Sequence, residues 1–444
     1  MVSIKRNIEI PDDNIFLNDL LNREREIEYL TKFINKTEEN FVMSINSDWG
    51  DGKTTFIKMW IKYLLKEKKN VVYYNAWEND DCKEPLISII NTIEDDINKT
   101  SETEVDINNV IEKSKEMMKS ISYNLVDKIS MGLIDCREIE NIIVDNAYKS
   151  HKAYKKRKMD LREALKILAE NNDKIIVFID ELDRCRPVFA IELLERIKHI
   201  FDIDKYIFVL AIDRDQLSYS IKTQYGINMD SDGYLKKFID MEYLLGKPCE
   251  NVYLEQLIKT SDIYQVEKAE LFISYIFKLV EYYKFSLRDM DKLVEYLKIF
   301  TKISVFSDDI KYRPDYIEYV SAVYSYLIIL MIKSPKEYKK IMNKKYDKDY
   351  IKTINTKIIK NKIASGLQCE INPKNQLHEC INLFLDMYLL SQEDLKKSKS
   401  DGKLKLKVYS TLGIGNLCAD IIINNNGADN LEDLKFISEN IIKL

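Results

Sequence analysis

Histidine, glycine and proline are scarce in this 444-residue chain, and its seven cysteines are scattered. There are three histidines and no C-x-x-C pair, so the ligand spacing of a structural zinc site is absent from the sequence. An odd number of dispersed cysteines does not form a disulfide framework and is typical of a reducing compartment. We therefore expect a cytoplasmic protein.

The chain also lacks a long hydrophobic run. Its longest uncharged apolar stretch, from Tyr319 to Ile332, has 14 residues and includes three tyrosines and two serines. A helix needs about 20 apolar residues to cross a bilayer. This stretch therefore predicts a buried helix and no transmembrane segment.

An excess of basic residues is missing as well, since the net charge is −5. Bulk charge thus gives no sign of a nucleic-acid-binding protein. One local exception is the segment from Lys149 to Lys158, in which six of ten residues are basic. It is either a contact for nucleic acid or an anionic membrane surface, or a solvated helix face. We favour the solvated face, so nucleic acid is a partner that we do not favour.

Glycines are few, with 11 in the chain, yet two of them flank Asp51 directly before Lys53. This glycine turn follows an apolar run, Phe41 to Ile45, and precedes a helical pattern from Phe56 to Leu65. A strand, a tight glycine turn, Lys-Thr and a helix form the layout of a phosphate-binding P-loop.

The chemistry of such a loop assigns roles to its residues. Backbone N–H groups of the loop and of the helix N-terminus suit an anion. Lys53 bridges the outer phosphates, and the Thr54 hydroxyl holds Mg²⁺. One position departs from the pattern, because Ser47 replaces the first glycine and serine tolerates a tight turn less well. The predicted nucleotide-binding residues are Asp48, Trp49, Gly50, Asp51, Gly52, Lys53, Thr54 and Thr55.

A second acidic strand completes the predicted site. The β-branched apolar run from Lys174 to Ile179 reads as a buried parallel strand and ends in Asp180 and Glu181. Parallel strands end at the same sheet edge, so Asp180 is the candidate second ligand for the Mg²⁺ at Thr54. Glu181 is then the candidate base that polarises the attacking water. Two alternatives remain: these acids cap the following helix, or Asp183 takes the role of Glu181.

Three further strands are expected, over Asn70–Trp77, Tyr206–Ile212 and Met241–Leu245. Strands that alternate with helices predict an open parallel α/β sheet. At the end of the second of these strands, Asp213 is a candidate sensor of the γ-phosphate. The predicted fold class is α/β, a three-layer P-loop NTPase sheet with a helical insert and a mainly helical C-terminal region.

These motifs resemble the KAP family of P-loop NTPases, which belongs to the ASCE division with an added catalytic acid. The resemblance covers roughly residues 15–335, and the run Asp180-Glu181-Leu182-Asp183-Arg184-Cys185 is its most specific part. The other matching pieces are Asp19–Glu24, Trp49–Thr54, Asn75–Trp77, Val209–Arg214, Tyr234–Ile239 and Ser286–Asp289. The resemblance implies an ATPase, a location of Asn22, Arg23 and Glu24 beside the adenine, and for several bacterial members a phage-exclusion or defence setting.

Three arginines are assigned with alternatives. Arg288, near the start of a helical pattern, is a candidate lid residue that reaches the γ-phosphate, or it forms a surface ion pair. Arg184 and Arg214 are each either an arginine finger presented to a neighbouring subunit or a lock that pairs with Asp183 or Asp215. For Arg184 we favour a structural or interface role.

The expected organisation has four parts. A lead-in segment covers residues 1–40 and contains a helix over Leu20–Phe33, and the NTPase core covers 41–250 with a helical insert at about 83–172. A helical lid covers 251–340, and a C-terminal helical domain of unknown role covers 341–444. A short exposed strand over Lys403–Tyr409 is expected within the last part.

The sequence thus predicts a Mg²⁺-dependent ATPase switch that acts through self-association as a homo-oligomer or on a separate effector protein. Two other classes stay open: a nucleic-acid-stimulated ATPase motor, and a nucleotide-stabilised scaffold with little hydrolysis. The serine at position 47 is the feature that favours the scaffold. ATP is preferred over GTP on the family resemblance alone, because no Asn-Lys-x-Asp motif is present.

Overall fold

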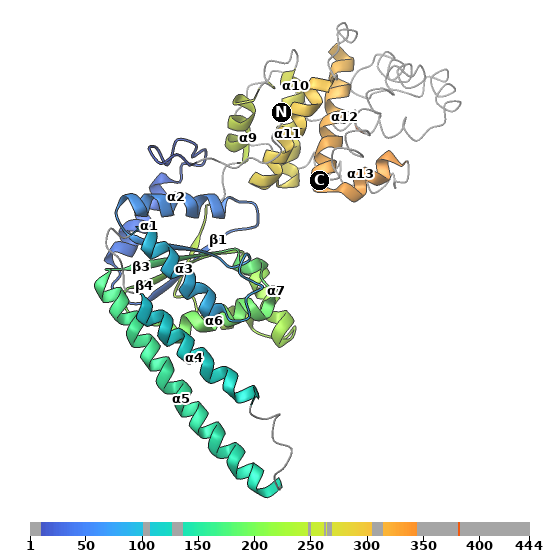
Figure 1. The fold of residues 1–444 in the computed structure, drawn as a ribbon. Helices are drawn as coiled ribbons and strands as arrows, with labels where there is room; N and C mark the ends of the chain where they lie inside the picture. The colour runs from blue at the N-terminus through green and yellow to red at the C-terminus, as the bar shows by residue number, and fades with distance from the viewer. Residues whose placement is uncertain are drawn as a thin grey trace. The chain divides into compact units, whose positions relative to one another are not determined.

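The computed structural model describes residues 10–100, 107–126, 136–246, 250–261, 263, 269–303, 314–343 and 381. These residues form two compact units, one of residues 10–246 and one of those from 250 onward (Figure 1). The predicted strand over Lys403–Tyr409 lies outside the described residues.

A five-stranded sheet is the centre of the first unit. Its strands are β1 (Phe41–Asn46), β2 (Asn70–Asn75), β3 (Ile175–Asp180), β4 (Tyr206–Ile212) and β5 (Met241–Leu244). The order is β2-β3-β4-β1-β5, and every pairing is parallel. The five predicted strands and the parallel α/β sheet are therefore confirmed, and β4 separates the P-loop strand β1 from the acidic strand β3.

The strands are apolar almost throughout because the sheet is covered on both faces. β3 and β4 are buried at every residue. Alternate side chains enter two separate cores, as the two-residue period of a strand requires. In β4, for example, Ile207 and Val209 enter one core, whereas Tyr206 and Phe208 enter the other.

Two helices pack on the first face of the sheet. They are α1 (Glu24–Lys36) and α2 (Lys53–Lys66), whose buried residues include Ile27 and Trp60. The Trp60 ring meets Phe178 of β3 edge to face at 5.2 Å, and its indole N–H donates to Thr31 of α1 at 2.9 Å. The predicted helix over Leu20–Phe33 exists, but it begins at Glu24 because Asp19 accepts the backbone N–H groups of the preceding turn.

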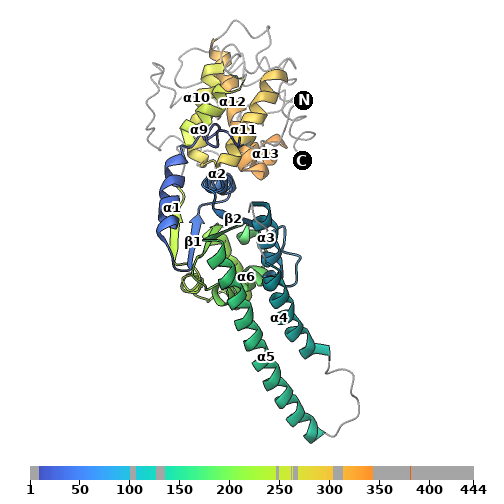
Figure 2. The same cartoon turned by 60° about the vertical axis from the view of Figure 1, so that its left-hand side comes forward.

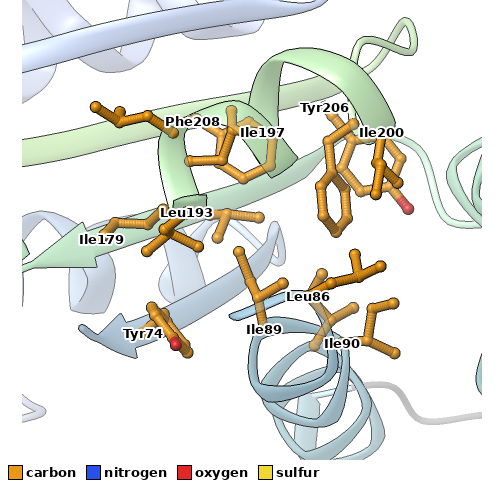
Figure 3. Close-up of a cluster of buried hydrophobic side chains, with 14 of the residues drawn as sticks. Tyr74, Leu86, Ile89, Ile90, Ile179, Leu193, Ile197, Ile200, Tyr206 and Phe208 are labelled. Carbon is orange, nitrogen blue, oxygen red and sulfur yellow. The ribbon is translucent and has the colours of Figure 1, made fainter. Parts of the chain in front are cut away.

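The opposite face carries α3 (Pro85–Thr100), α6 (Pro187–Ile200) and α7 (Arg214–Tyr225), with the short α8 (Ser231–Leu235) packed beside α7. Figure 2 shows α2 and α6 on opposite sides of the sheet. In the close-up of Figure 3, side chains of α3 and α6 meet those of the strands. The labelled residues are Tyr74, Leu86, Ile89, Ile90, Ile179, Leu193, Ile197, Ile200, Tyr206 and Phe208.

The predicted helical insert is confirmed, and the structure divides it. Helix α3 extends to Thr100, three residues into the stretch Asn98–Thr103 that the sequence predicts as a loop, and it covers the sheet itself. Helices α4 (Asn108–Val126) and α5 (Cys136–Asn171) then run side by side as a long hairpin (Figures 1 and 2). The C-terminal part of α5 returns to the core, where Leu161 and Leu165 are fully buried.

The second unit is helical. Its elements are α9 (Glu250–Lys259), α10 (Ala269–Tyr283), α11 (Leu287–Ile303), α12 (Pro314–Lys333) and α13 (Pro335–Met342). Ser286 and Asp289 cap α11 reciprocally, each side chain accepting the other residue's backbone N–H. The apolar run Tyr319–Ile332 lies within α12, and its residues from Ser321 to Met331 are buried, as the sequence predicts.

No helix among the described residues is long and apolar enough to cross a membrane.

Alanine replacements at buried and at exposed apolar residues should differ sharply in their effect on the free energy of unfolding. Phe208 is fully buried and meets Phe201 edge to face at 5.5 Å. Replacement by alanine should lower the free energy of unfolding by about 3–5 kcal/mol, through lost burial and the cavity left behind. Ile227→Ala, at a residue 85% exposed, should change it by less than about 0.5 kcal/mol.

Tryptophan fluorescence during urea unfolding measures the free energy of unfolding of the unit that contains the sheet. All three tryptophans of the chain, Trp49, Trp60 and Trp77, lie in the unit that contains the sheet. Equal losses of stability for the two variants would contradict the described core.

Candidate nucleotide-binding site

The predicted P-loop connects β1 to α2 with backbone geometry that only glycine adopts readily. Gly50 and Gly52 have φ angles of 94° and 89°. Gly52 is the N-cap of α2 and provides no side-chain cap, so the N–H groups of the first helical turn have no side-chain acceptor at the cap position. Such a helix N-terminus attracts anions.

Lys53 occupies the first position of α2 and is only 9% exposed. Its ammonium group donates to the backbone oxygens of Ser47 at 2.5 Å and Asp48 at 3.1 Å. Burial lowers the pKa of Lys53, and nearby carboxylates oppose that shift. In decreasing order of effect these are Asp183, Asp213, Asp51 and Asp180.

Ser47 does not strain the loop. It is absent from the described non-glycine residues with positive φ, so the backbone at this position does not need glycine. The prediction that serine at position 47 weakens the P-loop by tolerating the turn less well than glycine is therefore wrong. The Ser47 hydroxyl is buried and has no hydrogen-bond partner among the described residues.

The remaining loop residues are arranged around the same turn. The backbone N–H of Asp51 donates to the Asp48 oxygen at 3.4 Å, and the Asp51 side chain is buried. Thr54 and Thr55 follow Lys53 in the first turn of α2. The structure thus brings the eight predicted nucleotide-binding residues together in one continuous loop and helix start.

Asp180 ends β3 and faces the P-loop. It is 2% exposed, and it accepts hydrogen bonds from the Glu181 backbone N–H at 2.9 Å and the Tyr73 hydroxyl at 3.3 Å. Burial raises the pKa of Asp180, and the hydrogen bond from Thr54 is the first of several that oppose the rise.

The contact between Thr54 and Asp180 fits a magnesium ion. It places a hydroxyl and a carboxylate oxygen together beside the phosphate loop, and Mg²⁺ is commonly held by one or two carboxylates together with substrate phosphates. Among the described residues no group of three or more His, Cys, Asp or Glu side chains could hold a metal.

Glu181 has a strained backbone, with φ 60° and ψ 25°. Its carboxylate forms an ion pair with Arg184 at 2.9 Å, across one turn of 3₁₀ helix. The Arg184 guanidinium also lies over the Trp77 ring, 5.4 Å from its centroid. Left-handed backbone at a non-glycine residue costs about 1–3 kcal/mol and is concentrated at functional sites.

Asp183 lies between these groups and the P-loop. It is 7% exposed, and its Oδ2 accepts the indole N–H of Trp49 and the backbone N–H of Asp213 at 3.2 Å. The expected pair between Arg184 and Asp183 is not observed, because the guanidinium pairs with Glu181.

Asp213 joins β4 to α7 and caps that helix. Its Oδ1 accepts the Gln216 backbone N–H at 3.2 Å. Burial raises the pKa of Asp213, and the backbone hydrogen bond opposes this more than the nearby Lys53 charge does. The carboxylate predicted to sense the γ-phosphate thus also has a structural task at the same sheet edge.

Arg214 does not pair with Asp215, which was one expectation. Its guanidinium contacts Glu242 of β5 at 2.5 Å and Asp232 of α8 at 3.1 Å. Asn46, the last residue of β1, donates to Glu242 at 2.6 Å and accepts the Arg214 backbone N–H at 3.0 Å. Within the described residues, Arg214 is therefore held by acids of its own chain.

The Arg23 side chain is buried and links three parts of the first unit. It is 3% exposed, pairs with Glu26 at 2.6 Å and donates to the Gly246 carbonyl at 2.7 Å. Its guanidinium also lies 6.0 Å from the Phe56 ring in the second turn of α2. Arg23 thus connects the start of α1 to the end of β5 and to the P-loop helix.

Several partners at the site were not found by sequence reasoning. Tyr73 contacts Asp180 because β2 and β3 pair in register, with Asn75 opposite Asp180. Asp80 accepts the backbone N–H of Arg186 and the guanidinium Nε, each at 3.1 Å, and so joins the loops that follow β2 and β3. The apolar run of β2 predicted a strand, but no motif marked these side chains as neighbours of the site.

Arg288 lies in the other unit, near the start of α11, and its side chain is exposed. It forms no ion pair with any described residue, and the neighbouring Asp289 pairs with Lys333 at 2.8 Å.

The basic segment of α5 exposes Lys152, Lys155 and Lys156, whereas Arg157 donates to the Glu116 carbonyl of α4 at 3.0 Å.

The fold and the loop define a P-loop NTPase domain: a parallel sheet with a glycine turn, lysine and threonine after β1 and an acidic end on β3. The model of the KAP family P-loop domain matches residues 23–305, more than half of the chain. The protein belongs to this family. The resemblance seen in the sequence is confirmed.

Individual relatives are more distant. Uncharacterized protein MJ0182 of Methanocaldococcus jannaschii is 43% identical over 53 residues, which are 12% of this chain and 27% of that protein. The chain thus spans about a quarter of the length of this curated relative.

Two solved structures have low similarity to the whole chain. The ORC2 protein of Aeropyrum pernix, in its ADPNP and ADP complexes, has 14% identity and a TM-score of 0.35, with 96% of this chain and 98% of that chain covered. Drosophila ORC bound to poly(dA/dT) DNA and Cdc6 has 11% identity and a TM-score of 0.35, with 95% and 60% covered. Likeness at this level supports no argument about function.

The geometry of Ser47 makes a prediction about stability. Because its hydroxyl is buried without a described partner, Ser47→Ala should leave the free energy of unfolding unchanged or raise it by about 1 kcal/mol in nucleotide-free protein. Ser47→Gly should be less stable than Ser47→Ala by about 0.5–1 kcal/mol, because glycine adds freedom to the unfolded chain. Urea unfolding measures both, and a glycine variant more stable than the alanine variant would contradict the assigned backbone.

Proposed function

We propose that this KAP-family protein is a magnesium-dependent switch that binds and hydrolyses ATP. The observation that carries the proposal is the convergence of Lys53, the Thr54–Asp180 pair and Glu181 at the carboxyl ends of β1 and β3. These are the charge, the metal-binding oxygens and the base that phosphoryl transfer to water requires.

Lys53 binds the outer phosphates in this proposal. Its ammonium already lies against the loop, where it is held by two carbonyl oxygens, so little reorganisation is needed when phosphates arrive. Asp180 and Thr54 hold the magnesium. The ion, when bound, neutralises charge on the phosphate oxygens.

Glu181 orients the attacking water. It follows the buried Asp180 directly at the carboxyl end of β3, on a turn with left-handed backbone. The Arg184 guanidinium occupies the Glu181 carboxylate at 2.9 Å, so this ion pair must open or be shared before the carboxylate can accept a hydrogen bond from the attacking water. Arg184 thus acts on Glu181 within its own chain in this proposal.

Family membership supports a proposal about the wider role. The switch works in the cytoplasm through self-association or on a separate effector, in a setting of bacterial defence against phage like that of several family members. The scaffold alternative loses its one support, because the backbone at Ser47 accommodates serine without left-handed strain.

Two variants test the proposed ATPase. Glu181→Gln should retain Mg·ATP binding and lose turnover by about 10²–10⁴-fold, because only the base is removed. Lys53→Ala should abolish tight binding and, with it, the thermal stabilisation that ATP gives the wild type. Phosphate release and an ATP-dependent melting shift measure the two effects.

Glu170→Gln is the matched control, since Glu170 is exposed on α5 and, within the described part of the chain, forms an ion pair only with Lys166, at 3.9 Å. It should behave as the wild type does. Normal hydrolysis by Glu181→Gln would show that another group is the base.

The lid assignment of Arg288 has its own test. If the helical part from residue 251 closes over the nucleotide, Arg288→Ala should lower kcat about tenfold or more with little change in the Kd for Mg·ATP, since the guanidinium contacts the γ-phosphate only during transfer. Lys292→Ala, one turn further along α11 and also exposed, should have no effect. Equal kcat values for Arg288→Ala and the wild type would remove Arg288 from the site.

A further inference from the structure

Asp183 joins three segments that are distant in the chain. It belongs to the 3₁₀ turn Leu182–Arg184 after β3. One of its oxygens, Oδ2, accepts both the indole N–H of Trp49 in the P-loop and the backbone N–H of Asp213 at the end of β4. The three segments meet there because β4 lies between β1 and β3 in the sheet.

The position of Trp49 depends on this hydrogen bond more than on packing. The side chain is 45% exposed, so burial alone does not fix it. The loop after it contains Gly50 and Gly52, whose backbones have more freedom than those of other residues. By contrast, Asp183 is 7% exposed, and a buried carboxylate is stable only with hydrogen-bond donors.

Charge makes the link strong. Hydrogen bonds to an ionised carboxylate are roughly twice as strong as neutral ones. Loss of either donor would leave a buried charge undersatisfied, so the carboxylate, the indole and the turn at Asp213 are expected to behave as one unit.

We propose that Asp183 is a positioning residue that ties the P-loop, through Trp49, to the β4–α7 turn at Asp213 and so fixes the loop for nucleotide binding. This proposal rests on the nucleotide function proposed above. It gives Asp183 a role different from that of Glu181: Asp183 holds the loop, and Glu181 acts on water.

The link itself is measured first, without nucleotide. In a ¹H–¹⁵N spectrum the three tryptophans give three indole N–H signals, and the Trp49→Phe variant identifies that of Trp49. Its proton should lie downfield of the exposed Trp77 signal and move upfield in Asp183→Ala. Asp204→Asn, an exposed aspartate before β4, is the control and should leave the signal unchanged. An unchanged Trp49 signal in Asp183→Ala would overturn the link.

The functional consequence is measured by titration with Mg·ATP. Trp49→Phe and Asp183→Ala should each raise the Kd about tenfold or more, and the double variant should bind no more weakly than Asp183→Ala alone. Asp183→Asn, which keeps an oxygen acceptor, should recover part of the loss. In each variant the rise in Kd should exceed the fall in kcat at saturating ATP, because a positioning residue acts on binding more than on the chemical step.

Two results would overturn the proposal. If the double variant multiplies the two single effects, Trp49 and Asp183 act independently. If Asp183→Ala loses kcat at unchanged Kd while Trp49→Phe does not, Asp183 is the base. Trp49→Phe alters a half-exposed side chain and keeps an aromatic ring, so it tests the proposal even if Asp183→Ala does not fold. A wild type that binds no Mg·ATP would refute the nucleotide function, whereas the indole signal tests the link separately.

Discussion

Lys53 is a buried ammonium group, and the rest of the site depends on supplying charge to oppose its desolvation. Burial alone lowers its pKa, and an uncharged lysine would not attract phosphates. Four carboxylates counter this effect: Asp51 in the loop itself, Asp180 at the end of β3, Asp183 after that strand, and Asp213 after β4. The site is therefore a cluster of acidic side chains. Their mutual repulsion is offset because they surround the Lys53 ammonium and accept several hydrogen bonds.

Strand order provides that cluster. β4 lies between β1 and β3, and all strands run parallel, so the ends of the three strands lie side by side at one edge. The two cores on either face hold those ends rigidly, since β3 and β4 are buried at every residue. Rigid support matters because misplacing a catalytic group by about 1 Å can cost a hundredfold in rate.

The sequence predicted the strands, the P-loop and the acidic strand because each is a local pattern. A β-branched run of six residues followed by acids, or glycines before Lys-Thr, requires no knowledge of the rest of the chain. The helical insert could also be predicted from composition. Its division into a sheet-covering helix α3 and the α4–α5 hairpin could not, because that depends on which apolar faces meet.

Side-chain partners were the least predictable part. Arg214 pairs with Glu242, 28 residues away, and Trp49 donates to Asp183, 134 residues away. Pairs of this kind follow from sheet register and strand order, which a single sequence does not provide. Two acids, Glu181 and Asp183, precede Arg184 in the sequence, and only the turn geometry, with Glu181 in a left-handed conformation, selects Glu181 over Asp183.

The two acids that follow Asp180 illustrate how environment separates neighbouring carboxylates. Asp183 accepts two N–H donors at a single oxygen and is almost fully buried, which suits a fixed anion that holds other groups. Glu181 has a single cationic partner, on a side chain that also contacts an exposed tryptophan ring. Opening of this ion pair would free the Glu181 carboxylate and leave the hydrogen bonds of Asp183 in place. Under the proposed function, this turn thus holds both the anchor, Asp183, and the base, Glu181, within three residues.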